Sequence, residues 1–189
     1  MPEPRHGVVL LAAGASRRLG RPKQLVAIDG EPLVRRAARL ALATVPADAV
    51  VVLGADATAV AAAVRGLAVR PLRAPGWEHG MGASLRAGLD ALAPACAGAL
   101  VLLCDQPALD AAHLEALLAA WRLDPAGAAA SAYAGVLGVP AVLPRAWFPH
   151  VDAGADRGAR DLLRSRAAAV RAVPRAALAD DLDTPDRLP

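Results

Sequence analysis

A loop of small residues followed by cations is the segment whose composition and spacing most clearly suggest chemistry. Ala12-Ala13-Gly14-Ala15-Ser16 follows an apolar run, and the next residues include the cations Arg17, Arg18, Arg21 and Lys23. Small side chains let the backbone approach a ligand, and consecutive N–H groups form a cradle for anions. Cations at this spacing can neutralise a triphosphate and stabilise a departing pyrophosphate. An ordinary strand-to-helix turn with solvated charges explains this coincidence of features less well.

Lys23 is the one lysine among 21 basic residues, so the chain otherwise uses arginine for its cationic positions. A position that keeps lysine favours a compact, flexible point charge over a planar guanidinium. An accidental lysine is the alternative, and the surrounding loop argues against it. The loop has neither the Walker spacing nor the G-x-G-x-x-G pattern, which sets aside P-loop hydrolases and dinucleotide-dependent dehydrogenases.

Two acidic positions are candidates for holding Mg²⁺. Asp105 follows the apolar run Leu100–Leu103, and ligands of open α/β sheets bind outside the carboxyl ends of strands. Magnesium favours one or two carboxylates together with phosphate oxygens of the substrate. Asp183 lies near the end of the chain, before Thr184-Pro185. The alternatives are that Asp105 only begins a turn and that Asp183 only caps a helix.

A glycine-rich segment, Pro75–Leu89, is the third candidate region. Its glycines predict a flexible loop, and Ser84 could contact a ligand at the start of the helix that follows. Taken alone, Ser84 fits better as the cap of that helix. His79 fits a loop histidine better than a general base, because no serine or cysteine in a recognisable nucleophile setting accompanies it.

The elements expected to position these residues alternate between strands and helices. Strand-like runs are Val8–Ala12, Val50–Leu53, Val69–Leu72, Leu100–Leu103 and Val170–Val173. Amphipathic stretches of helical spacing are Leu33–Ala43, Ala57–Val64, Ala83–Leu92 and Leu109–Trp121. This alternation predicts βαβ units, hence a mainly parallel sheet covered by helices on both faces.

The alternation changes after about residue 124. Ala128–Tyr133 and Val139–Leu143 resemble strands joined by Ala134–Gly138 without a long helix, which predicts a hairpin or an antiparallel edge. Glycine and proline are spread evenly along the chain, so we expect one nucleotide-binding domain over residues 1–189, without a linker.

Composition excludes several other classes. No window approaches the roughly 18 uninterrupted apolar residues of a membrane span, and the first residues lack the regions of a signal peptide, so we expect a cytoplasmic protein. Cys96 and Cys104 fit buried thiols rather than a disulfide framework or a zinc site. The net charge of +3 comes from scattered arginines, so nucleic acid is not an expected partner and a small anionic substrate is.

Taken together, the segments resemble the molybdenum cofactor cytidylyltransferases, within the wider family of nucleotidyltransferases related to the molybdopterin guanylyltransferases. The resemblance runs from about Val8 to Leu188. It is carried by Leu-Ala-Ala-Gly with Pro-Lys-Gln, Gly80-Met81-Gly82-Ala83-Ser84, Asp105-Gln106-Pro107, Gly138-Val139-Pro140, Asp156–Arg160 and Asp183-Thr184-Pro185.

The resemblance implies a Rossmann-like nucleotidyltransferase fold, mostly parallel, with a small antiparallel portion in the C-terminal half. It also implies site residues. Leu11, Ala12, Ala13 and Gly14 would meet the nucleotide, Arg18 and Lys23 its phosphates, Gly80, Met81 and Ser84 its base, and Asp105 and Asp183 the Mg²⁺ ion. In this family an Ala-Ala-Gly loop accompanies CTP and an Ala-Gly-Gly loop GTP, and a methyl group on Ala13 would narrow the space that a purine needs.

Two positions depart from the family pattern. Val139 stands where a polar residue such as His or Asn usually precedes the proline, and Ala74 stands where Asn is frequent. We expect both positions in loops that face the acceptor, so these departures bear on the acceptor's identity more than on the nucleotide's.

The resulting hypothesis is transfer of CMP from CTP to a phosphorylated acceptor, chiefly molybdenum cofactor, with a molybdenum hydroxylase as the eventual client. Lys23, Arg18 and Asp105 would be the catalytic residues, and positioning with charge stabilisation would suffice without a general base. Alternatives are another acceptor (methylerythritol phosphate, a sugar phosphate or a phospholactate-type acid), a non-catalytic carrier of molybdenum cofactor, and a regulatory nucleotide-binding domain.

Overall fold

A seven-stranded sheet forms the centre of the molecule. The computed structural model describes residues 3–16 and 20–179, and within them the strand order is β5-β4-β1-β6-β8-β7-β9. The strands are β1 (His6–Ala12), β4 (Asp48–Leu53), β5 (Arg70–Arg73), β6 (Gly98–Leu103), β7 (Ala128–Tyr133), β8 (Val136–Pro144) and β9 (Val170–Pro174). A separate two-stranded ribbon pairs β2 (Ala27–Ile28) with β3 (Glu31–Pro32).

Strand β8 runs against its neighbours β6 and β7, while the other pairings in the sheet are parallel. The predicted mostly parallel sheet with an antiparallel portion in the C-terminal half is therefore confirmed. The hairpin between β7 and β8 is tighter than expected, because β8 already begins at Val136. Ala134 and Gly135 both adopt positive φ, which is the backbone of the two-residue turns that match strand twist.

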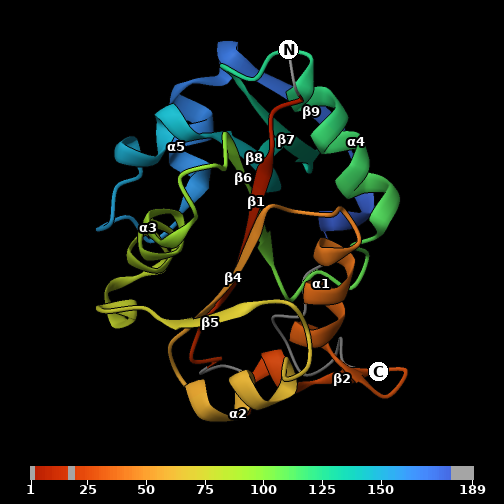
Figure 1. Cartoon of the computed structure of the whole chain (residues 1–189), viewed down its shortest axis with the longest axis vertical. Helices are drawn as coiled ribbons and strands as arrows, with labels where there is room; N and C mark the ends of the chain where they lie inside the picture. Colours follow the sequence, from red (N-terminus) through yellow and green to blue (C-terminus); the bar gives the residue numbers. More distant parts are fainter. Residues whose placement is uncertain (1–2, 17–19, 180–189) are drawn as a thin grey trace.

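Helices cover both faces of the sheet, as predicted. Figure 1 shows α3 (Met81–Ala91) and α5 (Ala159–Ser165) on one side, and α1 (Leu33–Leu42) and α4 (Ala111–Arg122) on the other. Helix α2 (Ala57–Ala63) packs with α1 and α4 in the same cluster of buried side chains. Short 3-10 helices complete the chain: η1 (Lys23–Leu25), η2 (Trp77–His79), η3 (Arg145–His150), η4 (Ala167–Ala169) and η5 (Ala176–Ala179).

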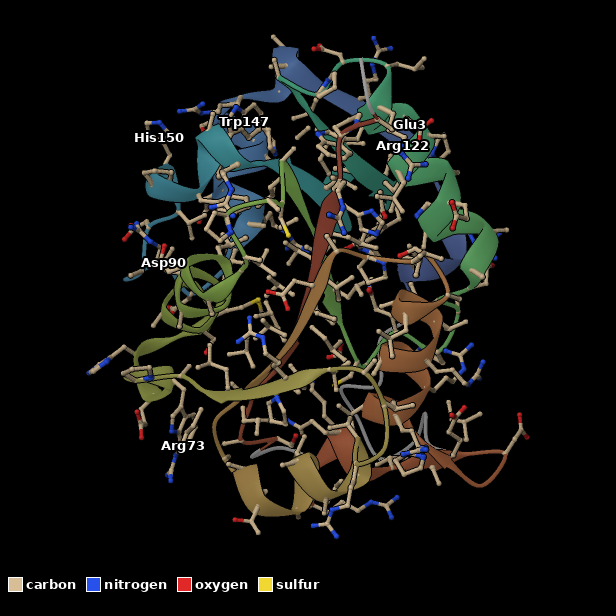
Figure 2. The ribbon with its side chains drawn as sticks, viewed as in Figure 1. Glu3, Arg73, Asp90, Arg122, Trp147 and His150 are labelled. Atoms are coloured by element: carbon tan, nitrogen blue, oxygen red, sulfur yellow. The ribbon has the colours of Figure 1, made fainter. Side chains whose placement is uncertain are left out.

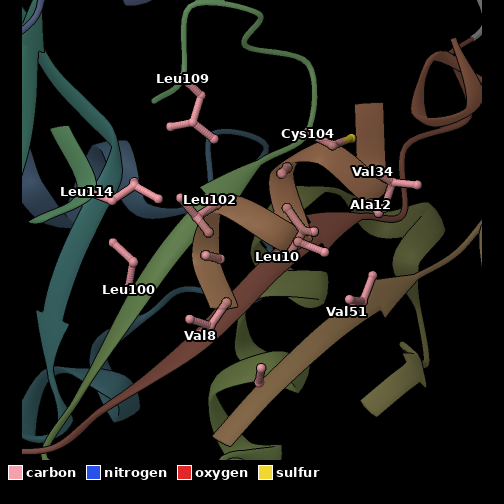
Figure 3. Close-up of a cluster of buried hydrophobic side chains, with 14 of the residues drawn as sticks. Val8, Leu10, Ala12, Val34, Val51, Leu100, Leu102, Cys104, Leu109 and Leu114 are labelled. Atoms are coloured by element: carbon pink, nitrogen blue, oxygen red, sulfur yellow. The ribbon is translucent and has the colours of Figure 1, made fainter. Parts of the chain in front are cut away.

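Alternate residues of the central strands enter opposite cores. Val8 and Leu10 of β1 belong to the cluster with α1 and α4, whereas Val9 and Leu11 belong to the cluster with α3 and α5. Figure 3 shows the first cluster, with side chains of three neighbouring strands meeting above the sheet. A strand buried on both faces needs an unbroken apolar sequence, which explains the continuous runs in the chain. None of the helices formed by residues 3–16 and 20–179 is long and apolar enough to cross a membrane.

Cys96 and Cys104 are buried free thiols, as predicted. Burial raises the pKa of the Cys104 thiol to about 12, and the neighbouring Asp105 carboxylate adds to the effect. The Cys104 thiol therefore stays protonated near neutral pH and behaves as a small apolar group.

His6, at the start of β1, is a buried neutral histidine. Its Nε2 lies 2.9 Å from Thr44 Oγ1, and the Thr44 hydroxyl donates to the carbonyl oxygen of Ala41 at 2.6 Å. Because that hydroxyl hydrogen is used, Nε2 carries the hydrogen and donates to Thr44. Burial, and secondarily the positive charge of Arg122, lowers the pKa of His6 from 6.5 to about 4. Figure 2 shows Arg122 beside Glu3 at this end of the sheet.

Acidification should therefore destabilise the fold before its carboxylates titrate. Between pH 6.5 and about 4 the unfolded chain binds a proton at His6 that the folded chain excludes. The contribution of neutral His6 to the free energy of unfolding is therefore fully present above this window and is lost as the pH falls through it. We expect a loss of roughly 2–3 kcal/mol in unfolding free energy from about pH 7.5 to about pH 4.5. Urea unfolding of wild type and His6→Gln measures it. The variant should keep only the smaller slope expected from His113, whose pKa is also lowered by burial and then by Arg175; equal slopes would contradict the assignment.

Candidate active site

The parallel strands β1, β4 and β6 end at the same edge of the sheet. The segments that follow β1 and β6 bring predicted site residues to this edge. The loop from Ala13 to Ser16 follows β1, and Asp105 follows β6, which is the neighbour of β1. The chain adds β4 and β5 on one side of β1 and then β6 on the other. The edge beside β1 is therefore the topological switch point, where open α/β sheets bind ligands.

The loop after β1 is braced by Gln24. Its Nε2 donates to the carbonyl oxygens of Ala12 at 3.2 Å and Gly14 at 2.7 Å, and Gln24 is buried. The backbone N–H of Lys23 donates to Ser16 Oγ at 3.0 Å. Short helix η1 thus folds back on the loop and holds the small residues in one conformation. The structural role of Gln24 was missed, although the residue stands in the Pro-Lys-Gln part of the motif.

Lys23 and Asp105, 82 residues apart in the sequence, form an ion pair between Nζ and Oδ2. Asp105 is 7% exposed, and its second oxygen, Oδ1, is buried without a hydrogen-bond partner in the part of the chain that the structure describes. The pair places one positive and one negative charge at the switch point. An acceptor oxygen that lacks a donor there is suited to a cation.

A cavity of about 390 Å³ opens above this edge. Every predicted nucleotide-binding or catalytic residue that the structure describes lines it: Leu11, Ala12, Ala13, Gly14, Lys23, Gly80, Met81, Ser84 and Asp105. Arg18 and Asp183 lie outside the described residues. The cavity wall also includes Gln24, Trp77, Glu78, Leu103, Cys104 and Asp156, which carried no predicted role.

Ser84 does not cap helix α3, so that interpretation is wrong. The helix begins at Met81 with Gly80 as its N-cap, and Ser84 lies a turn inside it, 3% exposed. The N-terminus is earlier than periodicity indicated because Gly80 adopts φ 124°, a conformation that glycine tolerates. Ser84 instead forms part of the cavity wall.

Two glycines permit the close approaches that shape this cavity. A Cβ on Gly54, after β4, would lie 2.5 Å from the carbonyl oxygen of Ala13. A Cβ on Gly82, in α3, would lie 2.2 Å from the carbonyl oxygen of Asp152, and the Gly82 N–H donates to Ala155 at 2.9 Å. The first contact seats the loop after β1, and the second docks the segment that precedes α5 against the start of α3.

A second cavity, of about 690 Å³, adjoins the first. Both are lined by Leu11, Lys23, Met81, Leu103, Asp105 and Asp156. The second extends toward Gln106, Tyr133, Val139, Arg157 and Arg160. A ligand in one cavity can therefore meet a ligand in the other beside the Lys23–Asp105 pair.

The two positions that depart from the family pattern differ in structure. Val139 lines the second cavity but lies in strand β8 rather than in a loop, and its position facing the acceptor stays a prediction. Ala74 is 1% exposed in the core beneath α3 and lines neither cavity, so its expected placement facing the acceptor is wrong. Its N–H donates to Leu53 at 2.9 Å, which holds the residue against the end of β4.

This arrangement defines a class of protein. A Rossmann-like sheet, a small-residue loop at its switch point and a cation–carboxylate pair between two cavities are suited to nucleotidyl transfer. The described residues hold no group of three or more His, Cys, Asp or Glu side chains that could bind a metal by themselves. A metal at this site would therefore need ligands beyond those that residues 3–16 and 20–179 supply.

Comparison with known proteins agrees with this class. The MobA-like NTP transferase domain matches residues 8–171, and the chain belongs to that family. It is 40% identical over 169 residues to nicotine blue oxidoreductase of Paenarthrobacter nicotinovorans, covering 84% of this chain and 81% of that protein. It is 32% identical over 191 residues to purine catabolism protein PucB of Bacillus subtilis, covering 94% and 91%.

Among solved structures, Rv0371c of Mycobacterium tuberculosis superposes with a TM-score of 0.81 at 27% identity, covering 98% of this chain and 96% of that one. The same protein has been solved in complex with manganese, and that structure superposes with a TM-score of 0.76 at 24% identity, covering 96% and 95%. The nucleotidyltransferase fold predicted from the sequence is therefore confirmed.

Proposed function

We propose that the chain transfers CMP from CTP to a phosphorylated acceptor, chiefly molybdenum cofactor, and releases pyrophosphate. The observation that carries the proposal is the pair of adjoining cavities that share Lys23 and Asp105. The first cavity has the Ala-Ala-Gly loop in its wall and would hold CTP. The second is larger and would hold the acceptor, with its phosphate directed to the shared wall.

The chemistry needs positioning and charge more than proton transfer. A terminal phosphate oxygen of the acceptor, already ionised near neutral pH, forms a bond to the α-phosphorus of CTP. The bond from that phosphorus to the bridging oxygen breaks, and pyrophosphate leaves with the electron pair. Lys23 would stabilise the charge that develops on the leaving group, with Arg18 as its expected partner. The loop after β1 would orient the phosphates through its N–H groups.

The residues at the switch point fit a divalent cation. Asp105 Oδ1 is buried and without a partner among the described residues, and a hard cation prefers such an oxygen. Asp105 would hold Mg²⁺ together with Asp183, and phosphate oxygens would complete its shell. When bound, the ion supplies Lewis-acid stabilisation of the phosphates. Lys23, paired with Asp105 at the same wall, would lie close enough to interact with the pyrophosphate.

Ala13 is proposed to favour CTP over GTP. It is 7% exposed in the wall of the first cavity, where its methyl group would narrow the space for the nucleotide. Ala13→Gly should lower the CTP:GTP ratio of kcat/KM by about 10-fold or more, since one methyl group in a pocket discriminates by about that factor. Steady-state kinetics with both nucleotides measures the ratio. Ala15→Gly, the same change in the same loop, should leave the ratio unchanged; a shift of equal size in both variants would contradict a specific role for Ala13.

The direct test is incubation of the chain with CTP, Mg²⁺ and molybdenum cofactor, followed by mass analysis. The expected product is the cytidine dinucleotide of the cofactor, with one pyrophosphate released per product. Parallel reactions with GTP, methylerythritol phosphate, sugar phosphates and phospholactate separate the other acceptors and nucleotides. Tight cofactor binding without nucleotide turnover would support the carrier alternative and overturn the enzyme.

A second candidate follows from the 40% identity to a protein named as an oxidoreductase of nicotine blue. This candidate predicts that the chain reduces the dye with NADH or NADPH in the absence of CTP. The loss of the dye's colour measures the reaction. The same preparation is used for both assays. Dye reduction that saturates with the dye and is unaffected by CTP and Mg²⁺ would favour this candidate.

A further inference from the structure

Gln106, next to Asp105, presents a buried oxygen that nothing in the described fold uses. The residue is 4% exposed and lines the second cavity. Its Nε2 donates to the carbonyl oxygen of Val139 at 3.1 Å. Because a carbonyl oxygen only accepts, the amide nitrogen must face Val139 and Oε1 must face away from it. Oε1 is buried and has no hydrogen-bond partner among residues 3–16 and 20–179.

The part of strand β8 that Gln106 contacts has other supports. Tyr133 Oη donates to the same Val139 oxygen at 3.0 Å. Ser131 Oγ donates to the carbonyl oxygen of Pro140 at 2.7 Å, and His113 Nε2 lies 2.8 Å from that Oγ. Strand β7 and helix α4 therefore hold this wall of the cavity together with Gln106. Bracing the wall accounts for the nitrogen of Gln106 and leaves its oxygen unexplained.

The unpartnered buried oxygens gather at the two cavities. Within the described ranges, the oxygens without a partner are Gln24 Oε1, Asp105 Oδ1 and Gln106 Oε1, and all three residues line a cavity. The other buried side-chain atoms without a hydrogen-bond partner in these ranges are nitrogens of Trp121, Arg122 and Arg175, which line neither cavity. A buried acceptor without a donor costs free energy, so a site that collects them is suited to a ligand that supplies donors or a cation.

We propose that Gln106 Oε1 accepts a hydrogen bond from an N–H or O–H group of the acceptor. The proposal rests on the assignment of the second cavity to the acceptor. Gln106 and Asp105 line the same cavity, so the donor and the reacting phosphate would belong to one ligand in that cavity. The substrate class is thus a phosphate ester whose body carries an amide, amine or hydroxyl near the phosphate. A plain alkyl phosphate lacks the hydrogen-bond donor that Gln106 Oε1 would accept.

Recognition and wall bracing can be separated by variants. Gln106→Met keeps the shape of the side chain and removes both polar atoms. Tyr133→Phe removes one donor from the Val139 oxygen and leaves Gln106 intact. Gln106→Glu keeps an oxygen acceptor for the cavity but loses the donor to Val139. A bracing role predicts similar behaviour of Gln106→Met and Tyr133→Phe, whereas recognition predicts that Gln106→Glu retains more binding than Gln106→Met.

The test measures binding without turnover. Each variant is saturated with Mg²⁺ and α,β-methylene CTP and titrated with 6-(hydroxymethyl)pterin phosphate, whose own fluorescence reports binding. Glycerol 3-phosphate, a hydroxyl donor, and n-butyl phosphate, which has no donor outside its phosphate, are measured as competitors. Gln106→Met should raise the Kd of the donor-bearing phosphate that wild type binds more tightly by about 3- to 10-fold, the range for one neutral hydrogen bond. The Kd of n-butyl phosphate should stay within about 2-fold of its wild-type value.

Each outcome decides. Equal weakening of all three probes means that Gln106 only shapes the wall, and unchanged binding of all three means that water alone satisfies Oε1; either overturns the proposal. Wild type that binds both donor-bearing phosphates no more tightly than n-butyl phosphate overturns it too. The selective loss in Gln106→Met upholds it even if wild type transfers no CMP to molybdenum cofactor, a result that would refute the proposed function alone.

Discussion

Asp105→Asn is expected to lower kcat by at least about 100-fold at saturating CTP and to raise the Mg²⁺ concentration for half-maximal activity. Asparagine keeps the size of the side chain and one carbonyl oxygen but removes the negative charge. Asp105 is 7% exposed, so the charge acts where water screens it little. Release of pyrophosphate, followed over a Mg²⁺ titration, measures both quantities, and the Kd for CTP shows whether the first cavity remains intact.

Asp90→Asn is the matched control for Asp105. Asp90 is on α3 (Figure 2), and its side chain is 57% exposed. It pairs with Arg86 one helical turn away. The same chemical change there should leave kcat and the Mg²⁺ dependence unchanged, because exposed pairs contribute little. A kcat for Asp105→Asn within about 3-fold of the control, at an unchanged Mg²⁺ optimum, would remove Asp105 from the metal site.

Lys23→Ala is expected to lower kcat by about 100- to 1000-fold under saturating CTP and Mg²⁺, with a smaller change in the KM for CTP. The reason is that charge on the pyrophosphate develops as the bond breaks, so the ammonium group stabilises the transition state more than the bound nucleotide. Lys23→Arg should recover only part of the activity, since a planar guanidinium does not replace a compact charge beside Asp105.

Two further measurements make the Lys23 result interpretable. Thermal unfolding of Lys23→Ala reports the cost of leaving the buried Asp105 without its ion-pair partner. Arg73 is an exposed residue at the end of β5 and lines neither cavity (Figure 2), so Arg73→Ala removes a positive charge and should change neither kcat nor KM. Turnover of Lys23→Ala within a few-fold of wild type would refute the role of Lys23 on the leaving group.

The local pattern of the chain was enough to predict the strands that carry the site. The uninterrupted apolar runs of β1 and β6 can only be buried on both faces, and helices between them require parallel pairing. Parallel neighbours end at the same edge, and the pairing of β1 with β6 in the structure brings the loop after β1 and Asp105 together. The hairpin of β7 and β8 was equally readable, because no helical segment separates the two runs.

Sequence patterns gave wrong predictions for Ser84 and Ala74, whose positions depend on backbone conformation and packing. Ser84 looked like a helix cap because small polar residues favour that position, but Gly80 starts α3 earlier. Ala74 was expected to face the acceptor because it stands where the family frequently has Asn, yet its N–H bonds to the end of β4 and its side chain packs in the core. In both cases the flanking tertiary contacts outweighed the expectation from the sequence pattern.

The sequence alone therefore determined the class of fold, the small-residue loop and the carboxylate at the end of β6, since these depend on periodicity and composition over short stretches. Only the tertiary structure decided that Lys23 pairs with Asp105, that Gln24 braces the loop and that Gln106 faces Val139. Such contacts depend on the order of strands in the sheet and on the side-chain directions at its edge. Neither has a signature in the spacing of residues along the chain.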